Sequence, residues 1–160
     1  MSHLAAIALG SNLPSQWGGP AGNLHEAVRC LGELGAVRAV SSFFETAPVG
    51  YTDQPNFLNA AALLETTLEP EALMQGLLEI ERSMGRDRSA APAKGPRIID
   101  LDLLIMDGFI RATPQLTLPH PALAERRFVL APLAQIAADM VHPVTGNSVI
   151  EMLIRLERAT

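Results

Sequence analysis

Cysteine, lysine and long apolar runs are nearly absent from this chain. Cys30 is its only cysteine, which excludes an internal disulfide and leaves too few thiolates for a zinc cluster, so we expect a buried, inert thiol. No apolar run approaches the roughly 18 residues of a membrane-spanning helix. The opening segment shows neither a basic leader nor a small-residue cleavage pattern. These absences predict a cytoplasmic protein with no membrane association.

The overall charge is acidic. A net charge of −5 argues against a general nucleic-acid binder, whose surface would carry a basic face. The 160 residues, 48% of them apolar, fit a single domain spanning 1–160, because a chain of this length buries about two-thirds of its unfolded surface. We expect a monomer.

Positive charge is concentrated between Arg82 and Arg97. This stretch holds five basic residues and the single acid Asp87, a balance of 5 − 1 = +4 within an acidic protein. Arginine dominates, since Lys94 is the only lysine of the chain, and the guanidinium fork suits bidentate contacts with phosphate oxygens. We interpret the stretch as a site for a compact anion. The alternative is that these arginines pair with surface acids on neighbouring helices.

Apolar periodicity predicts the element order βαββαβ. Gly10-Ser11-Asn12 would end the first strand in a turn, Asn23 would cap the first helix, and Pro70 would open the second. This order is typical of a ferredoxin-like α+β fold, an antiparallel sheet with both helices on one face. We expect strands over 4–9, 37–46, 57–67 and 98–106, and helices over 23–35 and 70–85.

A C-terminal helical extension is expected beyond the last of these strands. A proline-bounded loop around His120 precedes a helix from Pro132 to about Asp139. Ser148 and Glu151 have the spacing of a capping box, which predicts a final helix after them.

Asp100 and Asp102 stand two residues apart in the apolar run GPRIIDLDLLIM (95–106). Side chains two apart on a strand share a face, so the two carboxylates point the same way. Like charges in partly dry surroundings either bind a proton or recruit a cation, and oxygen ligands suit magnesium. The alternative is an exposed face with two solvated acids. Ile98, Leu104 and Met106, which have the same parity, argue against that alternative.

Four further positions carry weaker signals. Glu81 borders the apolar stripe of its helix and either pairs with Arg86 from the basic stretch or belongs to a surface pair. Phe57 and Asn59 share parity and would suit a flat heterocycle, although a core phenylalanine beside a polar strand residue is the commoner explanation. His120 either donates to phosphate or only fixes its loop.

Six segments together resemble the 6-hydroxymethyl-7,8-dihydropterin pyrophosphokinase family of folate biosynthesis. The resemblance extends from about residue 5 to about residue 140, and GPRxxDLDLL followed by PH…RxF is its most specific part. The segments are ALGSN (8–12), SSFFETAPVG (41–50), DQPNFLNAA (53–61), IERSMGRDR (80–88), GPRIIDLDLL (95–104) and LPHPALAERRFVLAPL (118–133).

The resemblance implies an ATP-dependent diphosphotransferase that releases AMP and requires two magnesium ions with ATP. Its partners would be ATP and 6-hydroxymethyl-7,8-dihydropterin. By position, it implies catalytic roles for Arg86, Arg97, Asp100 and Asp102; metal binding by Asp100 and Asp102; pterin binding by Thr46, Phe57, Asn59 and Phe128; and ATP binding by Met74, Glu81, Arg86, Arg88, Arg97, Leu103, Thr117, His120 and Arg126.

Four positions depart from the family pattern. Lys94 stands where a loop tryptophan is found, Pro121 where an aromatic residue is common, Gln115 in place of a basic residue and Leu78 in place of a polar one. These differences bear on adenine contacts and loop closure.

Two other functions are compatible with parts of the sequence. A non-catalytic ferredoxin-like module that binds an anionic metabolite would explain the basic stretch but not the paired aspartates. A metal-dependent nuclease would explain the aspartates, but the acidic net charge disfavours it.

Overall fold

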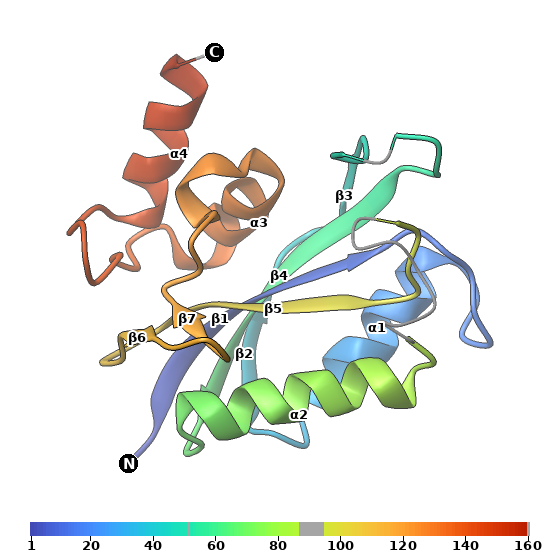
Figure 1. Ribbon diagram of the computed structural model, residues 1–160, viewed down its shortest axis with the longest axis horizontal. Coiled ribbons are helices and arrows are strands. Elements are labelled where there is room, and N and C mark those ends of the chain that lie inside the picture. The colour runs from blue at the N-terminus through green and yellow to red at the C-terminus, as the bar shows by residue number, and fades with distance from the viewer. Residues whose placement is uncertain (51, 87–94, 160) are drawn as a thin grey trace.

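The centre of the fold is a five-stranded antiparallel sheet (Figure 1). The computed structural model describes residues 1–50, 52–86 and 95–159. The strand order is β2-β4-β1-β5, with β3 also paired to β4, which is the order of a ferredoxin-like fold and confirms the predicted class. The strands are β1 (His3–Ser11), β2 (Ala36–Val40), β3 (Phe44–Thr46), β4 (Phe57–Thr66) and β5 (Asp100–Met106).

Helices cover both faces of the sheet. Figure 1 shows α1 (Pro20–Leu31) and α2 (Pro70–Ser83) on one side, and α3 (Arg127–Ala137) and α4 (Val149–Arg158) on the other. The first pair is the one that the βαββαβ pattern predicts. The C-terminal extension therefore supplies the second layer, and the two layers enclose separate apolar cores.

Strand alternation divides the apolar residues between these cores. Ile7 and Leu9 of β1 face α1 and α2, whereas Ala6 faces α3 and α4. Ala61 of β4 joins Ala6 on the second face, and Leu130 of α3 packs in the same cluster. Because alanine side chains project so little from the sheet, α3 can lie close to β1 and β4. The start of α3 then lies near the ends of these two strands.

The first helix starts earlier than predicted. It begins at Pro20, whose fixed φ and missing N–H suit the first turn, and it ends at Leu31 before Gly32. Asn23 is therefore not its N-cap. The side chain of Asn23 is fully buried, and its Nδ2 donates to the carbonyls of Leu13 (2.7 Å) and Ile98 (3.2 Å). Tertiary hydrogen bonds explain this asparagine, rather than local capping.

The predicted strand over 37–46 is divided in two. The division falls at Ser41, whose side chain takes the place of a backbone acceptor. The backbone N–H of Ser41 donates to the carbonyl of Ala61, and Ser41 Oγ accepts from the backbone N–H of Ala61, both at 2.9 Å. Strand β3 then pairs with the start of β4. β1, by contrast, is longer than predicted and continues through Gly10 to Ser11.

A β-bulge interrupts the pairing of β5 with β1. Ala6 pairs with Ile105 and Ile7 with Leu103, so Leu104 is the extra residue. Met106 consequently lies in the core beside α1 and α2, which contradicts its predicted place on the face of the aspartates. Ile98 precedes the strand and also packs against that core, so of the three apolar residues only Leu104 shares the face of the aspartates.

The C-terminal region departs from the prediction at one helix. Pro132 lies inside α3 and not at its start, while Ser148 and Glu151 form the predicted capping box of α4. Between β5 and α3 lie β6 (Arg111–Ala112), β7 (Thr117–Leu118) and a short 3-10 helix, η1 (Leu123–Glu125). Within the described residues, no helix is both long and apolar enough to cross a membrane.

Candidate active site

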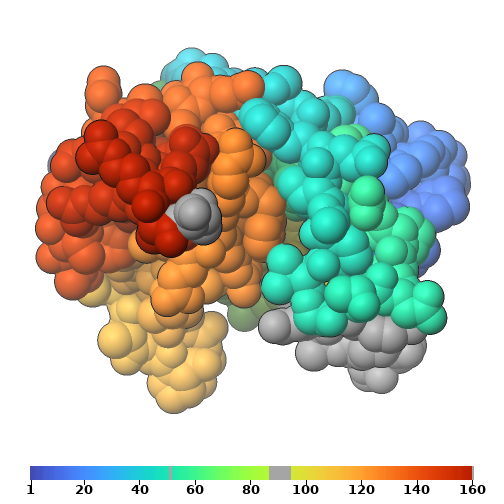
Figure 2. All heavy atoms as spheres, turned by 90° about the horizontal axis from the view of Figure 1, so that it is seen from above, coloured from blue at the N-terminus to red at the C-terminus, as the bar shows by residue number. Residues whose placement is uncertain are grey.

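A cavity of about 360 Å³ opens beside the ends of β1, β4 and β5, on the face that carries α3. Figure 2 shows the surface hollowed between the orange chain around α3 and the teal chain around β3 and β4. Its lining combines apolar, acidic and basic side chains: Ala8, Leu9, Gly10, Thr46, Ala47, Val49, Phe57, Asn59, Ala60, Arg86, Arg97, Asp100, Asp102, His120, Arg126, Phe128 and Val129.

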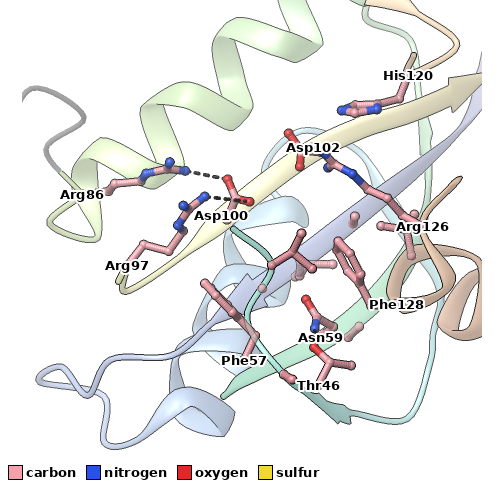
Figure 3. A pocket seen from close by; sticks show the side chains of 17 residues that line it. Thr46, Phe57, Asn59, Arg86, Arg97, Asp100, Asp102, His120, Arg126 and Phe128 are labelled. Atoms are coloured by element: carbon pink, nitrogen blue, oxygen red, sulfur yellow. Dashed lines mark hydrogen bonds and ion pairs between the residues drawn. The ribbon is translucent and has the colours of Figure 1, made fainter. Parts of the chain in front are cut away.

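Asp100 and Asp102 both face this cavity from β5 (Figure 3). Leu101, between them, points to the opposite face and is 3% exposed. The predicted shared face of the two carboxylates is therefore confirmed. Their carboxylate oxygens lie on one wall of the cavity, where they can contact a bound ligand.

Two arginines hold the carboxylate of Asp100. Arg86 Nη1 lies 2.6 Å from Asp100 Oδ1, and Arg97 Nη1 lies 3.4 Å from Asp100 Oδ2. The arginine side chains are 11% and 14% exposed, so these contacts are sheltered from water. Asp100 thus has positive charge beside it, which reduces its repulsion with Asp102.

Glu81, which does not line the cavity, supports Arg86. It is 2% exposed, and its Oε2 accepts hydrogen bonds from Arg86 Nη1 at 2.9 Å and from the backbone N–H of Leu101 at 2.7 Å. The surface-pair alternative for Glu81 is therefore wrong. Because the same oxygen contacts β5 and Arg86, this buried acid fixes the arginine relative to the strand of the aspartates.

Asn12, which the sequence places in the turn after the first strand, performs a similar task for Arg97. Its Oδ1 accepts from the backbone N–H of Arg97 at 2.9 Å, and its own N–H donates to the carbonyl of Arg97 at 3.1 Å. Its Nδ2 donates to Gln54 Oε1 and to the carbonyl of Pro55, both at 2.9 Å. The side chain, 2% exposed, does not line the cavity but joins three segments around it. The only sequence feature that could have indicated this role was the position of Asn12 in the string GSN.

The other end of the cavity is aromatic and amide-lined. Phe57 and Asn59 lie on the same face of β4, as their parity predicts, and Phe128 approaches from the start of α3 (Figure 3). The guanidinium carbon of Arg97 lies 5.6 Å from the ring centroid of Phe57, and that of Arg126 lies 5.8 Å from that of Phe128. Each aromatic ring thus lies next to an arginine, at the boundary between the apolar and the charged half of the cavity.

His120 reaches the cavity from the loop before η1. Its backbone N–H donates to the carbonyl of Leu104 at 2.8 Å, and its Nδ1 accepts from the backbone N–H of Ala122 at 3.1 Å. Burial lowers the pKa of its imidazole, the nearby Arg126 lowers it further, and Asp100 opposes the shift. A neutral ring whose Nδ1 accepts carries its proton on Nε2, which can donate to an anion.

Not every residue selected from the sequence reaches the cavity. Met74 and Glu81 of α2, Leu103 of β5 and Thr117 of β7 do not line it. Leu103 is 1% exposed in the core beside α1 and α2, so only its backbone could reach a nucleotide. Arg88 and Lys94 lie outside the described residues. Ala47, Val49 and Gly10 line the cavity but carry no sequence signal of their own beyond the family strings.

Known proteins match this chain over most of its length. The family model of 7,8-dihydro-6-hydroxymethylpterin-pyrophosphokinase matches residues 6–138. The 2-amino-4-hydroxy-6-hydroxymethyldihydropteridine pyrophosphokinase of Bacillus subtilis is 43% identical, with 91% of this chain and 85% of that protein covered. That of Methylorubrum extorquens is 41% identical, with 96% and 93% covered.

Longer proteins contain a similar segment. The folic acid synthesis protein fol1 of Schizosaccharomyces pombe is 37% identical, and the chain covers 20% of its length, with 96% of the chain aligned. A crystal structure of an HPPK-DHPS in complex with substrates shares the fold, with a TM-score of 0.74 at 14% identity, covering 99% of this chain and 44% of that one. The cavity described above thus belongs to a member of the 7,8-dihydro-6-hydroxymethylpterin-pyrophosphokinase family.

Proposed function

We propose that this protein transfers the diphosphate group of ATP to the hydroxymethyl oxygen of 6-hydroxymethyl-7,8-dihydropterin, releases AMP, and serves folate biosynthesis. Membership of the family supports the reaction. The observation that carries the assignment of the site is that Asp100 and Asp102 share one cavity with Phe57 and Phe128. A charged end and an aromatic end in one cavity suit a phosphate donor and a flat heterocyclic acceptor.

The pterin would occupy the aromatic end. Phe57 and Phe128 would lie against the faces of its ring, and Asn59, which is hydrogen-bonded to Thr46, would contact its polar edge. Val49 and Ala47 extend the apolar surface there. This placement directs the hydroxymethyl group towards the aspartates and arginines, which is the alignment that in-line transfer requires.

The triphosphate would occupy the charged end. Arg86, Arg97 and Arg126 line it, and Nε2–H of His120 adds a neutral donor. During transfer the hydroxymethyl oxygen bonds to the β-phosphorus, the bond from that phosphorus to the oxygen bridging to the α-phosphorus breaks, and the hydroxyl proton passes to solvent. Arg86 and Arg97 would stabilise the negative charge that collects on the departing AMP oxygen.

The residues present fit two magnesium ions. Asp100 and Asp102 offer hard oxygen donors on one wall, and among the residues that the structure describes no group of three or more His, Cys, Asp or Glu side chains could hold a metal alone. Magnesium bound through one or two carboxylates together with substrate phosphates matches that donor set. When bound, the ions would neutralise phosphate charge and lower the pKa of the substrate hydroxyl. We propose further that the protein is a cytoplasmic monomer with one domain over 1–160.

The reaction is tested by mixing the protein with ATP, magnesium and the pterin alcohol and measuring AMP by chromatography. We expect AMP only when both the pterin alcohol and magnesium are present, and none after EDTA is added. Binding of ATP without AMP release would favour the non-catalytic module instead. Degradation of added DNA would favour the nuclease, and either result would refute the proposal.

A further inference from the structure

The carboxamide of Asn59 lies at the junction of three strands. Asn59 belongs to β4, where its register partners are Gly10 on β1 and Phe44 on β3. It is 9% exposed and lines the cavity beside Phe57 (Figure 3). A carboxamide carries an oxygen that accepts and a nitrogen that donates, and a half-turn about its last bond exchanges the two. Its neighbours therefore decide which group a ligand meets.

Thr46 contacts one side of this carboxamide. Asn59 Nδ2 donates a hydrogen bond to Thr46 Oγ1, which uses one of the two N–H groups. The nitrogen is therefore directed towards β3, and the oxygen is directed towards β1. Thr46 also lines the cavity, but its hydroxyl is engaged by this hydrogen bond to Asn59.

Gly10 leaves space for the oxygen on the other side. A Cβ placed on Gly10 would lie 3.0 Å from Asn59 Oδ1, which is closer than a side chain normally approaches. Gly10 does not have a positive φ, so the conformation of its backbone does not explain the glycine. The close approach of Asn59 Oδ1 does explain it.

We propose that Thr46 is a positioning residue that fixes the orientation of the Asn59 carboxamide, while Gly10 keeps its oxygen in place. The oxygen then selects a heterocycle edge that presents an N–H donor and rejects one that presents an acceptor there. This inference rests on the proposed function, because the pterin is the heterocycle concerned. It differs from a direct contact between Thr46 and the pterin in that the effect of Thr46 passes through Asn59.

A double-mutant cycle tests the inference. Thr46→Val removes the hydroxyl and keeps the shape, and Thr46→Ser restores the hydroxyl. Affinity for 6-hydroxymethylpterin is measured by calorimetry in the presence of a non-hydrolysable ATP analogue. We expect Thr46→Val to weaken pterin binding about three- to tenfold, the cost of one neutral hydrogen bond. We expect Thr46→Ser to restore most of that affinity and Thr46→Val to change nothing in an Asn59→Ala background.

Three results would overturn the inference. Equal losses from Thr46→Val with and without Asn59 would show direct contact with the pterin, and no loss in the wild-type background would show that the hydroxyl orients nothing. Absence of pterin binding by the unaltered protein would overturn the proposed function together with the inference. This failure is distinguishable from a failure of the inference alone, because it is seen in the unaltered protein before any substitution is made. Unchanged affinity for the ATP analogue and unchanged thermal unfolding check that each variant is folded. Gly10→Ala provides a second variant, for which we expect weakened pterin binding with unchanged nucleotide binding.

Discussion

The guanidinium of Arg86 donates to the carboxylate of Asp100 at 2.6 Å, so a residue expected to bind phosphate and one expected to bind metal lie in direct contact. The same guanidinium donates to Glu81 at 2.9 Å. A cation at Asp100 would compete with Arg86, and an anion beside Arg86 would compete with Asp100. We therefore expect magnesium and phosphate to enter together, each satisfying the group that the other displaces.

Replacing Glu81 should destabilise the fold and the site together. Glu81→Gln keeps the volume and an acceptor for the N–H of Leu101, but it leaves Arg86 without its buried negative partner. We expect the free energy of unfolding to fall by about 1–3 kcal/mol, the usual cost of losing a hydrogen bond to a charged group. Urea denaturation measures this change. Glu79→Gln is the matched control on the same helix, and equal unfolding midpoints for the two variants would contradict the assigned role.

Replacing Arg97 should impair chemistry more than binding. Arg97→Ala removes a guanidinium that faces Asp100 and the expected position of the leaving oxygen. We expect single-turnover rates to fall roughly 100-fold or more, in line with the loss of a transition-state donor, while pterin affinity changes severalfold at most. Rapid-quench measurement of AMP gives the rate. Arg38→Ala, which removes an exposed arginine paired with Glu65, is the control. Unchanged single-turnover rates in Arg97→Ala would refute the assignment.

Asn12 should matter through the backbone of Arg97. Asn12→Ala removes its side-chain hydrogen bonds to Arg97, Gln54 and Pro55, so we expect kcat to fall about tenfold, the equivalent of one or two hydrogen bonds. Asn12→Asp keeps the acceptor for the Arg97 N–H and loses the donors. Partial recovery of kcat in Asn12→Asp would assign the effect to Arg97. Wild-type kcat in Asn12→Ala would show that these contacts do not position the arginine.

His120 should make stability depend on pH. Its pKa is lower in the folded protein than the ordinary value of 6.5, because burial and Arg126 disfavour the charged ring. The unfolded chain therefore binds the proton more readily, and stability falls as pH drops below the ordinary pKa towards the folded one. His120→Gln should flatten this dependence as the pH falls through 6.5 and below it.

Burial also lowers the pKa of His142, which would add its own pH dependence. The protein that keeps His120 and the His120→Gln variant should therefore both be compared in a His142→Gln background. Urea denaturation at each pH measures the free energy of unfolding. Parallel pH profiles for the two proteins would contradict a lowered pKa at His120.

The sequence predicted the elements whose signals are local. The apolar stripe and opening proline of α2, the Ser148–Glu151 capping box and the shared face of Asp100 and Asp102 each depend on spacing within one element, and the structure confirms all three. Periodicity of this kind survives folding because neighbours in sequence stay neighbours in space.

The failed predictions depend on contacts between distant segments. Asn23 resembles an N-cap but is buried by partners 10 and 75 residues away, and Met106 lies on the other face because a bulge interrupts the pairing of β5 with β1. Asn12 joins residues that lie 42 and 85 positions from it. Spacing along the chain does not predict such contacts, so the hydrogen bonds of Asn12 and Asn23 emerged only from the structure.

The proposed function requires that Asp100 and Asp102 serve the nucleotide and not the pterin. AMP formation by Asp100→Asn and Asp102→Asn, measured with pterin affinity in the absence of nucleotide, tests this directly. We predict that each variant loses at least about 100-fold in AMP formation, as expected when metal-mediated charge stabilisation is removed, and binds the pterin as the unaltered protein does. AMP formation at the unaltered rate in either variant would contradict the proposed function.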